Sequence, residues 1–150
     1  MKIRDTSPDP LRRNNASTPA ARREGSGLFS LFASELKTIQ VEGANYDHDI
    51  SELRKEIDVA GQMLEREPTL PNFKRFRELL SRLAKRISNE AYRLEKVGGT
   101  PMNPRYYEII TVIDKEADKL YQLIVSEQKD RMAITASVIG IKGLVVDLVT

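Results

Sequence analysis

Residues 134–149 read Ile-Thr-Ala-Ser-Val-Ile-Gly-Ile-Lys-Gly-Leu-Val-Val-Asp-Leu-Val, and ten of the sixteen are aliphatic or alanine. Positions 134, 138, 141, 145 and 148 repeat at steps of four and three, which favours a helix. The other apolar residues cover nearly every remaining side, and a helix that is apolar all round must be surrounded by other elements. We therefore predict a central helix on which amphipathic helices pack.

Two other structures compete for this segment. A membrane span needs roughly 20 largely uncharged residues. This segment is shorter and carries Lys142 and Asp147, so we predict no integral membrane segment. A buried strand would share its β-branched composition but not its length. Gly140 and Gly143 each cost about 1 kcal/mol inside a helix, and their spacing predicts close approach by a neighbouring helix as compensation.

The composition is that of a soluble chain that fits one domain. The chain has 150 residues, of which 31% are charged, and its mean hydropathy is −0.43. It contains no cysteine, which excludes disulfides, thiolate nucleophiles and cysteine-based metal sites. Residues 1–26 lack the apolar segment of a signal peptide, so we expect a cytoplasmic protein.

Residues 1–26 differ in composition from the rest of the chain. They hold three prolines and only two large aliphatic residues, Ile3 and Leu11. Such a segment cannot bury enough apolar surface to offset the entropy cost of ordering. Its six basic and three acidic residues give +3, so residues 27–150 carry −1 of the total of +2. We predict a disordered basic tail, 1–26, and a single helical bundle domain, 27–150.

Apolar spacing divides the first part of this domain into two helices. The first is predicted over residues 28–41 and ends at Gly43. The second begins at Asp47 or Asp49, because either side chain can accept hydrogen bonds from the first backbone N–H groups. It stops before Pro68, because the residue preceding a proline avoids the helical conformation.

Capping residues mark the remaining helices. Thr69 caps a third helix that ends at the Gly98-Gly99 pair. The Asn103-Pro104 pair opens a fourth, with asparagine as N-cap and proline at the first helical position. Either one long helix continues from there to residue 149, or the chain turns near Ser126-Glu127, and we favour the turn. The predicted fold is all-α, an antiparallel bundle of four to five helices with a disordered N-terminal tail.

Three segments carry a family resemblance in their order and spacing. They are Gly61-Gln-Met-Leu64-Glu-Arg-Glu-Pro68-Thr69, Phe76-Arg-Glu-Leu79-Leu80 with Tyr92 further on, and Ile141-Lys-Gly143-Leu144-Val-Val-Asp147-Leu148. From about residue 29 to its end the chain resembles the YaaR family, small bacterial helical proteins of unassigned biochemical function. The resemblance implies an all-α domain. It implies no catalytic or ligand-binding residue, because none is established for the family.

Basic side chains gather on one face of the third predicted helix. At 100° per residue they fall within an arc of about 120°, interrupted in sign only by Glu78. This basic face comprises Lys74, Arg75, Arg82, Lys85, Arg86, Arg93 and Lys96. Residues 69–97 carry eight basic and three acidic side chains, whereas residues 45–67 carry three basic and seven acidic ones. The face is either a binding surface for phosphates or an acidic protein, or a solvated surface partly neutralised by the acidic second helix.

Few residues suggest chemistry. His48 is the only histidine, and with Asp47 and Asp49 beside it we expect helix capping rather than metal binding, because adjacent side chains do not converge easily. Asp114 and Asp118 lie one turn apart, where paired carboxylates can hold a cation or act as acid and base, but are more often solvated.

Asp147 is a carboxylate within an apolar run. We expect it to pair with Arg131, Lys142 or another arginine of the bundle, and a functionally perturbed carboxylate is the alternative. The chain has no glycine-rich phosphate loop and no serine–histidine–aspartate constellation that His48 could complete without moving. We therefore predict no catalytic residue, no metal site and no cofactor.

The sequence favours a non-enzymatic helical protein that serves as a protein-interaction module or adaptor, with an unknown protein as its partner. The alternative is a nucleic-acid-binding protein that uses the basic face together with the arginine-containing tail. Whether the protein forms a homo-oligomer stays open.

Overall fold

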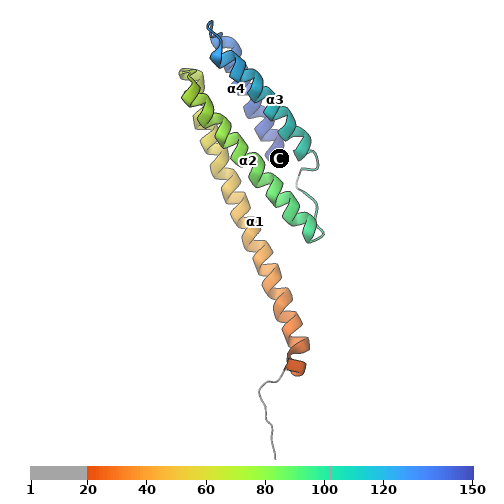
Figure 1. The fold of residues 1–150 in the computed structure, drawn as a ribbon. Coiled ribbons are helices and arrows are strands. Elements are labelled where there is room, and N and C mark those ends of the chain that lie inside the picture. Colours follow the sequence, from red (N-terminus) through yellow and green to blue (C-terminus); the bar gives the residue numbers. More distant parts are fainter. Residues whose placement is uncertain (1–19, 102) are drawn as a thin grey trace, which may run out of the picture. The chain divides into compact units, whose positions relative to one another are not determined.

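The computed structural model describes the backbone of residues 20–101 and 103–150, and the side chains of residues 33, 34, 43–101 and 103–150. Its helices are α1 (Ala20–Arg66), α2 (Leu70–Lys96), α3 (Tyr106–Val125) and α4 (Arg131–Val149), coloured along the chain in Figure 1. No residue within the described ranges forms a strand. The predicted all-α fold is confirmed.

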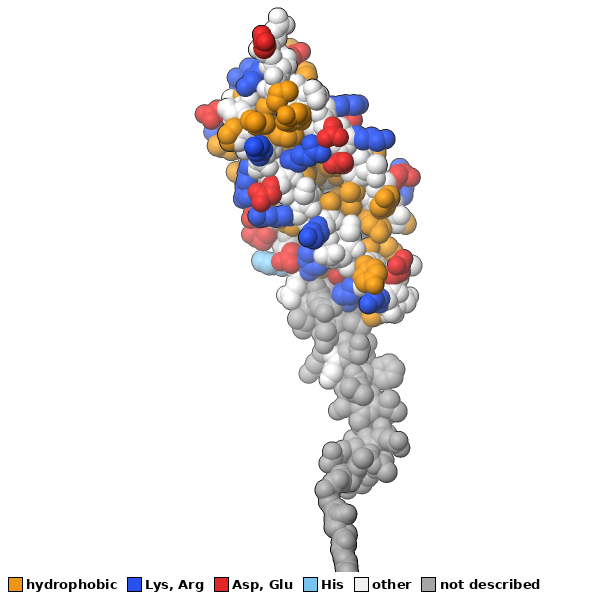
Figure 2. Space-filling model, in the orientation of Figure 1, with side chains coloured by type: hydrophobic (Ala, Val, Ile, Leu, Met, Phe, Trp, Pro, Cys, Tyr) orange, Lys and Arg blue, Asp and Glu red, His pale blue; other side chains and the backbone are white. Residues whose placement is uncertain are grey.

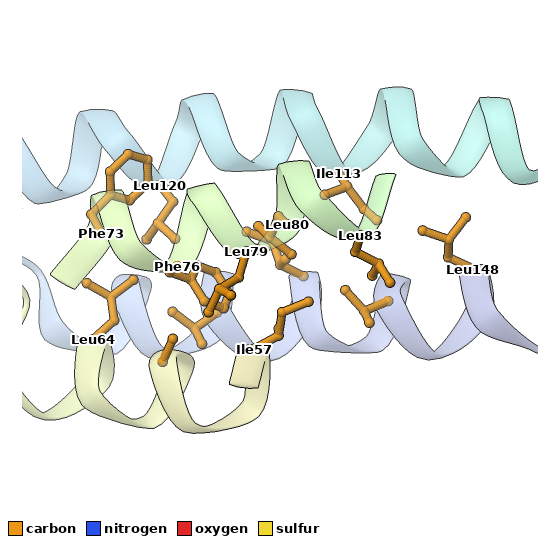
Figure 3. Packing of buried hydrophobic residues seen from close by; sticks show 14 of the residues in the cluster. Ile57, Leu64, Phe73, Phe76, Leu79, Leu80, Leu83, Ile113, Leu120 and Leu148 are labelled. Atoms are coloured by element: carbon orange, nitrogen blue, oxygen red, sulfur yellow. The ribbon is translucent and has the colours of Figure 1, made fainter. Parts of the chain in front are cut away.

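The chain divides into two compact units, Met1–Ala44 and Asn45–Thr150. The predicted tail falls in the first unit, where residues 1–19 lie outside the described residues and the backbone of 20–26 belongs to α1. The second unit holds the hydrophobic core, and Figure 3 shows side chains from all four helices meeting there. The largest fully buried side chains are Ile57, Leu64, Phe76, Leu79, Leu83, Leu120, Ile134, Val138 and Ile141.

The predicted break near Gly43 is wrong, because α1 continues through it to Arg66. Ending one helix and starting another leaves up to four backbone N–H and four C=O groups without helical partners. Continuing through one glycine costs only about 1 kcal/mol. The predicted capping at Asp47 or Asp49 is wrong for the same reason, since both residues and His48 lie inside the helix with exposed side chains.

The predicted limits of α2 are confirmed. The Thr69 hydroxyl accepts a hydrogen bond from the backbone N–H of Asn72 at 3.4 Å. At the other end Gly98 adopts a φ of 81°, which glycine tolerates far better than other residues. The Gly99 N–H donates to the carbonyl of Leu94 at 2.7 Å, which satisfies one of the last helical acceptors.

The start of α3 differs from the prediction, because the helix begins at Tyr106. Asn103 instead closes a turn, in which its side-chain oxygen accepts from the Arg105 N–H at 2.9 Å. Its side-chain nitrogen donates to the carbonyl of Asp147 at 2.7 Å, which ties this turn to the end of α4. The predicted turn near Ser126 is confirmed, since α3 ends at Val125. After that turn Asp130 caps α4.

One stripe of α4 lies in the core, as predicted. Ile134, Val138, Ile141, Val145 and Leu148 are at most 4% exposed. Leu148 points toward α2 and α3 in Figure 3. The repeat of four and three residues in the sequence therefore marks the buried stripe correctly.

The predicted role of the two α4 glycines is wrong. Gly140 and Gly143 are exposed, and a Cβ atom at either position would have nothing within 4 Å. Close helix approach occurs at Gly61 of α1 instead. There a Cβ atom would overlap Lys142 and lie 3.1 Å from Val138 Cγ1.

Candidate functional site

The structure places the whole basic face on α2. All seven side chains are exposed or partly exposed. Five of them nevertheless contact an acidic or aromatic side chain. The five are Arg75, Arg82, Arg86, Arg93 and Lys96.

Two of these arginines join α2 to the acidic part of α1. Arg75 Nη2 lies 3.7 Å from Glu56 Oε1, an exposed pair. Arg86 Nε donates to Asp49 Oδ2 at 3.1 Å, and its guanidinium lies 5.1 Å from the centre of the Tyr46 ring. Their charge is therefore balanced across the helix pair and is not presented alone to a partner.

Two more arginines are balanced within α2 itself. Arg82 Nη2 donates to Glu78 Oε2 at 3.1 Å, one turn away. Arg93 binds Glu90 through two parallel hydrogen bonds of 2.9 Å each, and Glu90 is only 7% exposed. The pKa of the Tyr46 hydroxyl is raised, mainly because the hydroxyl is buried and also because the negative charge of Glu90 is nearby.

Of the seven basic-face residues, Lys74 and Lys85 are the two that contact no acidic or aromatic side chain among the described residues. Lys96 is exposed but lies over the Tyr92 ring, with its Nζ 5.0 Å from the ring centre. Figure 2 shows basic and acidic side chains intermixed over the face it presents. This arrangement favours the interpretation of a solvated, internally neutralised surface over that of a phosphate site.

The paired aspartates of α3 bind an arginine. Arg77 of α2 lies 2.9 Å from Asp114 and 2.8 Å from Asp118, so one guanidinium bridges both carboxylates. Burial alone would lower the pKa of Arg77, but the hydrogen bonds to Asp118 and Asp114 outweigh it and raise that pKa. The carboxylates therefore join α3 to α2 through Arg77, and both side chains are solvent-exposed as expected, at 69% and 66%.

The single histidine lies between two aspartates on α1. Asp47, His48 and Asp49 follow one another along α1, and Asp49 already accepts from Arg86. In the part of the chain that the structure describes, no group of three or more histidines and carboxylates is placed to hold a metal ion.

The predicted pairing of Asp147 is wrong. Lys142 lies 3.1 Å from Asp58 and 3.7 Å from Glu65, both on α1. Arg131 donates to the backbone carbonyls of Glu65 and Arg66, at 3.2 and 2.7 Å. The Asp147 carboxylate is exposed and has no basic partner among the described side chains.

The largest departure from expectation is the side of α4 that faces away from the core. Met132, Ile139 and Val146 are 84%, 58% and 47% exposed. Smaller exposed residues lie between them on the same helical face. We call this surface the α4 outer face, and it comprises Met132, Ala136, Ile139, Gly140, Gly143 and Val146.

The comparisons with known proteins place the chain in a family. A family described as "Protein of unknown function (DUF327)" matches residues 7–149. The chain belongs to the DUF327 family. The resemblance to the YaaR family is thereby confirmed.

The DUF327 fold also occurs in a solved structure. An uncharacterized protein from Bacillus halodurans, BH1478, is 21% identical in sequence and superposes with a TM-score of 0.65. The match covers 78% of this chain and 97% of the other. At this identity the likeness shows the fold alone. No curated protein matches the chain.

Sequence reasoning missed the outer face of this DUF327 chain because α4 is apolar on almost every side. Without a polar stripe, the pattern does not tell which side faces solvent. By length and composition alone α4 would also qualify as a membrane span, because the mean hydropathy reaches 1.9 over an 18-residue segment of the helix. Core helices pass the same test, and α4 buries Ile134, Val138 and Ile141 almost completely.

Proposed function

We propose that this chain is a non-enzymatic protein-interaction module of the cytoplasm, and that the α4 outer face is where a protein partner binds. The observation that carries the proposal is the exposure of Met132, Ile139 and Val146 on one side of one helix. Isolated exposed apolar residues are normal, but several on one face mark interaction surfaces.

The surroundings of the outer face fit protein binding. Asp147 is exposed at one end of α4 and Arg131 at the other, so charged groups flank an apolar centre. Protein interfaces commonly combine an apolar centre with a polar rim. The helix is held rigidly from behind, because its core stripe is almost fully buried.

The alternative, nucleic-acid binding through the basic face and the arginine-containing tail, has less support. Binding to phosphates depends on cations that are free to replace counterions. Arg75, Arg86 and Arg93 are instead engaged with carboxylates of this chain.

Site-specific photo-crosslinking in the cells that make the protein tests the proposal. The crosslinker replaces Ile139 on the α4 outer face, and a matched control replaces Val59 on α1, because the two residues are 58% and 59% exposed. We expect protein crosslinks from position 139 well above those from position 59. Equal yields at the two positions would refute the proposal. A gel-shift assay at increasing salt tests the alternative on the same protein.

A further inference from the structure

We propose that the occupant of the α4 outer face is a second copy of this chain, packed α4 against α4 in antiparallel orientation about a two-fold axis between Ile139 and Gly140. This inference rests on the proposed function and names the partner of that surface. Two-fold dimers with the same patch on both subunits are the commonest soluble oligomers.

The order of large and small residues makes the face complementary to itself. In an antiparallel pair centred between residues 139 and 140, Ile139 of each copy lies opposite Gly140 of the other. Ala136 likewise lies opposite Gly143, and Met132 lies opposite the end of α4 near Val146. Ile139 is 58% exposed, and a Cβ atom at Gly140 would meet nothing within 4 Å. A protruding side chain therefore meets an open position, as tight helix packing requires.

Charges at the two ends of α4 favour the same orientation. The antiparallel pairing brings Asp147 of one copy level with the first turn of α4 in the other. Asp147 has no basic partner among the described side chains. A carboxylate is also stabilised near a helix N-terminus, by typically 0.3–1 kcal/mol. A parallel pairing would instead bring the two Asp147 carboxylates together.

The rims of α4 add apolar surface to the contact. A groove of about 530 Å³ runs between α3 and α4, lined by Val112, Leu144 and Asp147 among others. Val112 is 40% exposed. A contact limited to one helix and its rims falls at the small end of specific interfaces, so we expect a reversible dimer that dissociates on dilution.

Two measurements on the purified full-length chain test the inference. Sedimentation velocity over a wide concentration range should show a monomer–dimer equilibrium. Gly140→Leu, which fills the open position, should weaken the dimer affinity at least tenfold. The matched control Val59→Ser on α1 should leave the dimer affinity unchanged. Circular dichroism checks that each variant keeps its helices. A monomer at every concentration would overturn the inference.

Single cysteines then test the orientation, because the chain has no cysteine of its own. Under mild oxidation Ile139→Cys should form a disulfide-linked dimer, because the two copies of position 139 lie next to the axis. Val146→Cys should not, because its two copies lie far apart in an antiparallel pair. Equal yields from both positions would indicate parallel pairing and overturn the proposal.

The photo-crosslinking experiment separates this inference from the proposed function. If the chain is monomeric and position 139 crosslinks to a different protein, the second copy is excluded and the interaction module stands. If the chain is monomeric and position 139 crosslinks to no protein, both fall, and protection of position 139 by lipid vesicles would then assign the face to a membrane surface.

Discussion

Three of the glycines inside α1 and α4, Gly61, Gly140 and Gly143, allow a sharp test of how these helices pack. Replacing a helical glycine by alanine favours the helix by about 1 kcal/mol. Gly61 differs from Gly140 and Gly143 because its Cβ atom would overlap Lys142 and lie 3.1 Å from Val138 Cγ1. The same substitution should therefore have opposite effects at the two kinds of position.

The expected magnitudes follow from these contacts. Forcing an extra methyl group into a packed site typically costs 1–3 kcal/mol. Moving Lys142 also weakens its ion pairs with Asp58, at 3.1 Å, and Glu65, at 3.7 Å. The side chains of Lys142, Glu65 and Asp58 are 21%, 25% and 63% exposed, so these pairs lie at the edge of solvent, where ion pairs contribute about 0–1 kcal/mol. Offset by the helical gain, Gly61→Ala should destabilise the fold by roughly 1 kcal/mol, whereas Gly140→Ala and Gly143→Ala should each stabilise it by about 1 kcal/mol.

Urea unfolding of dilute protein, followed by circular dichroism, measures these differences without a contribution from self-association. Combining Gly61→Ala with Lys142→Ala completes a double-mutant cycle, and the cost of the alanine at position 61 should fall by about 1 kcal/mol in that background. If Gly61→Ala stabilised the protein as much as Gly140→Ala does, the close approach of α4 to α1 would be refuted.

Three further predictions concern the polar contacts between helices. Arg77→Met should destabilise the fold by about 0.5–1 kcal/mol in thermal denaturation, because it removes the ion pairs that join α2 to two exposed carboxylates of α3. Tyr46→Phe should abolish a loss of stability that the wild-type protein shows at alkaline pH. Folding raises the pKa of the Tyr46 hydroxyl above its unfolded value of about 10. The stabilisation from the neutral hydroxyl is therefore complete below about pH 10 and is lost as the pH rises through the folded-state pKa. Arg75→Glu should lower the melting temperature more than Lys74→Glu, because Arg75 lies close to Glu56 of α1, whereas Lys74 has no carboxylate partner among the described side chains. Neither charge reversal should change retention on DNA or RNA if the basic face is a solvated surface.

Local signals in the sequence predicted the ends of helices where one residue type satisfies a specific backbone group. Thr69 and Gly98 mark the ends of α2 because a hydroxyl acceptor and a positive φ are needed there. The same kind of signal failed at Gly43 and Asp47. Glycine and aspartate are both tolerated inside a helix. Whether the helix ends at such a residue depends on two free-energy costs: that of leaving backbone groups without helical partners and that of keeping the residue in the helix.

The basic face could be located but not interpreted from the sequence. Its residues lie on α2 as the helical spacing predicts, yet the charges of Arg75 and Arg86 are balanced by carboxylates of another helix. Arg86 of α2 binds Asp49, which is 37 positions away on α1, and Arg75 of α2 lies close to Glu56, which is also on α1. Spacing along one helix cannot reveal which residues of another helix lie beside it, so a solvated and a functional face look alike in the sequence.

α4 is not the enclosed helix that its composition suggests. Within the unit Asn45–Thr150 its described neighbours are α2, α3 and the part of α1 that follows Ala44. These cover the stripe from Ile134 to Leu148 and leave Met132, Ile139 and Val146 in solvent. The apolar residues beyond that stripe therefore have no structural role within the described part of one molecule. Contact with another α4 is the role that uses both their apolar character and the open positions between them.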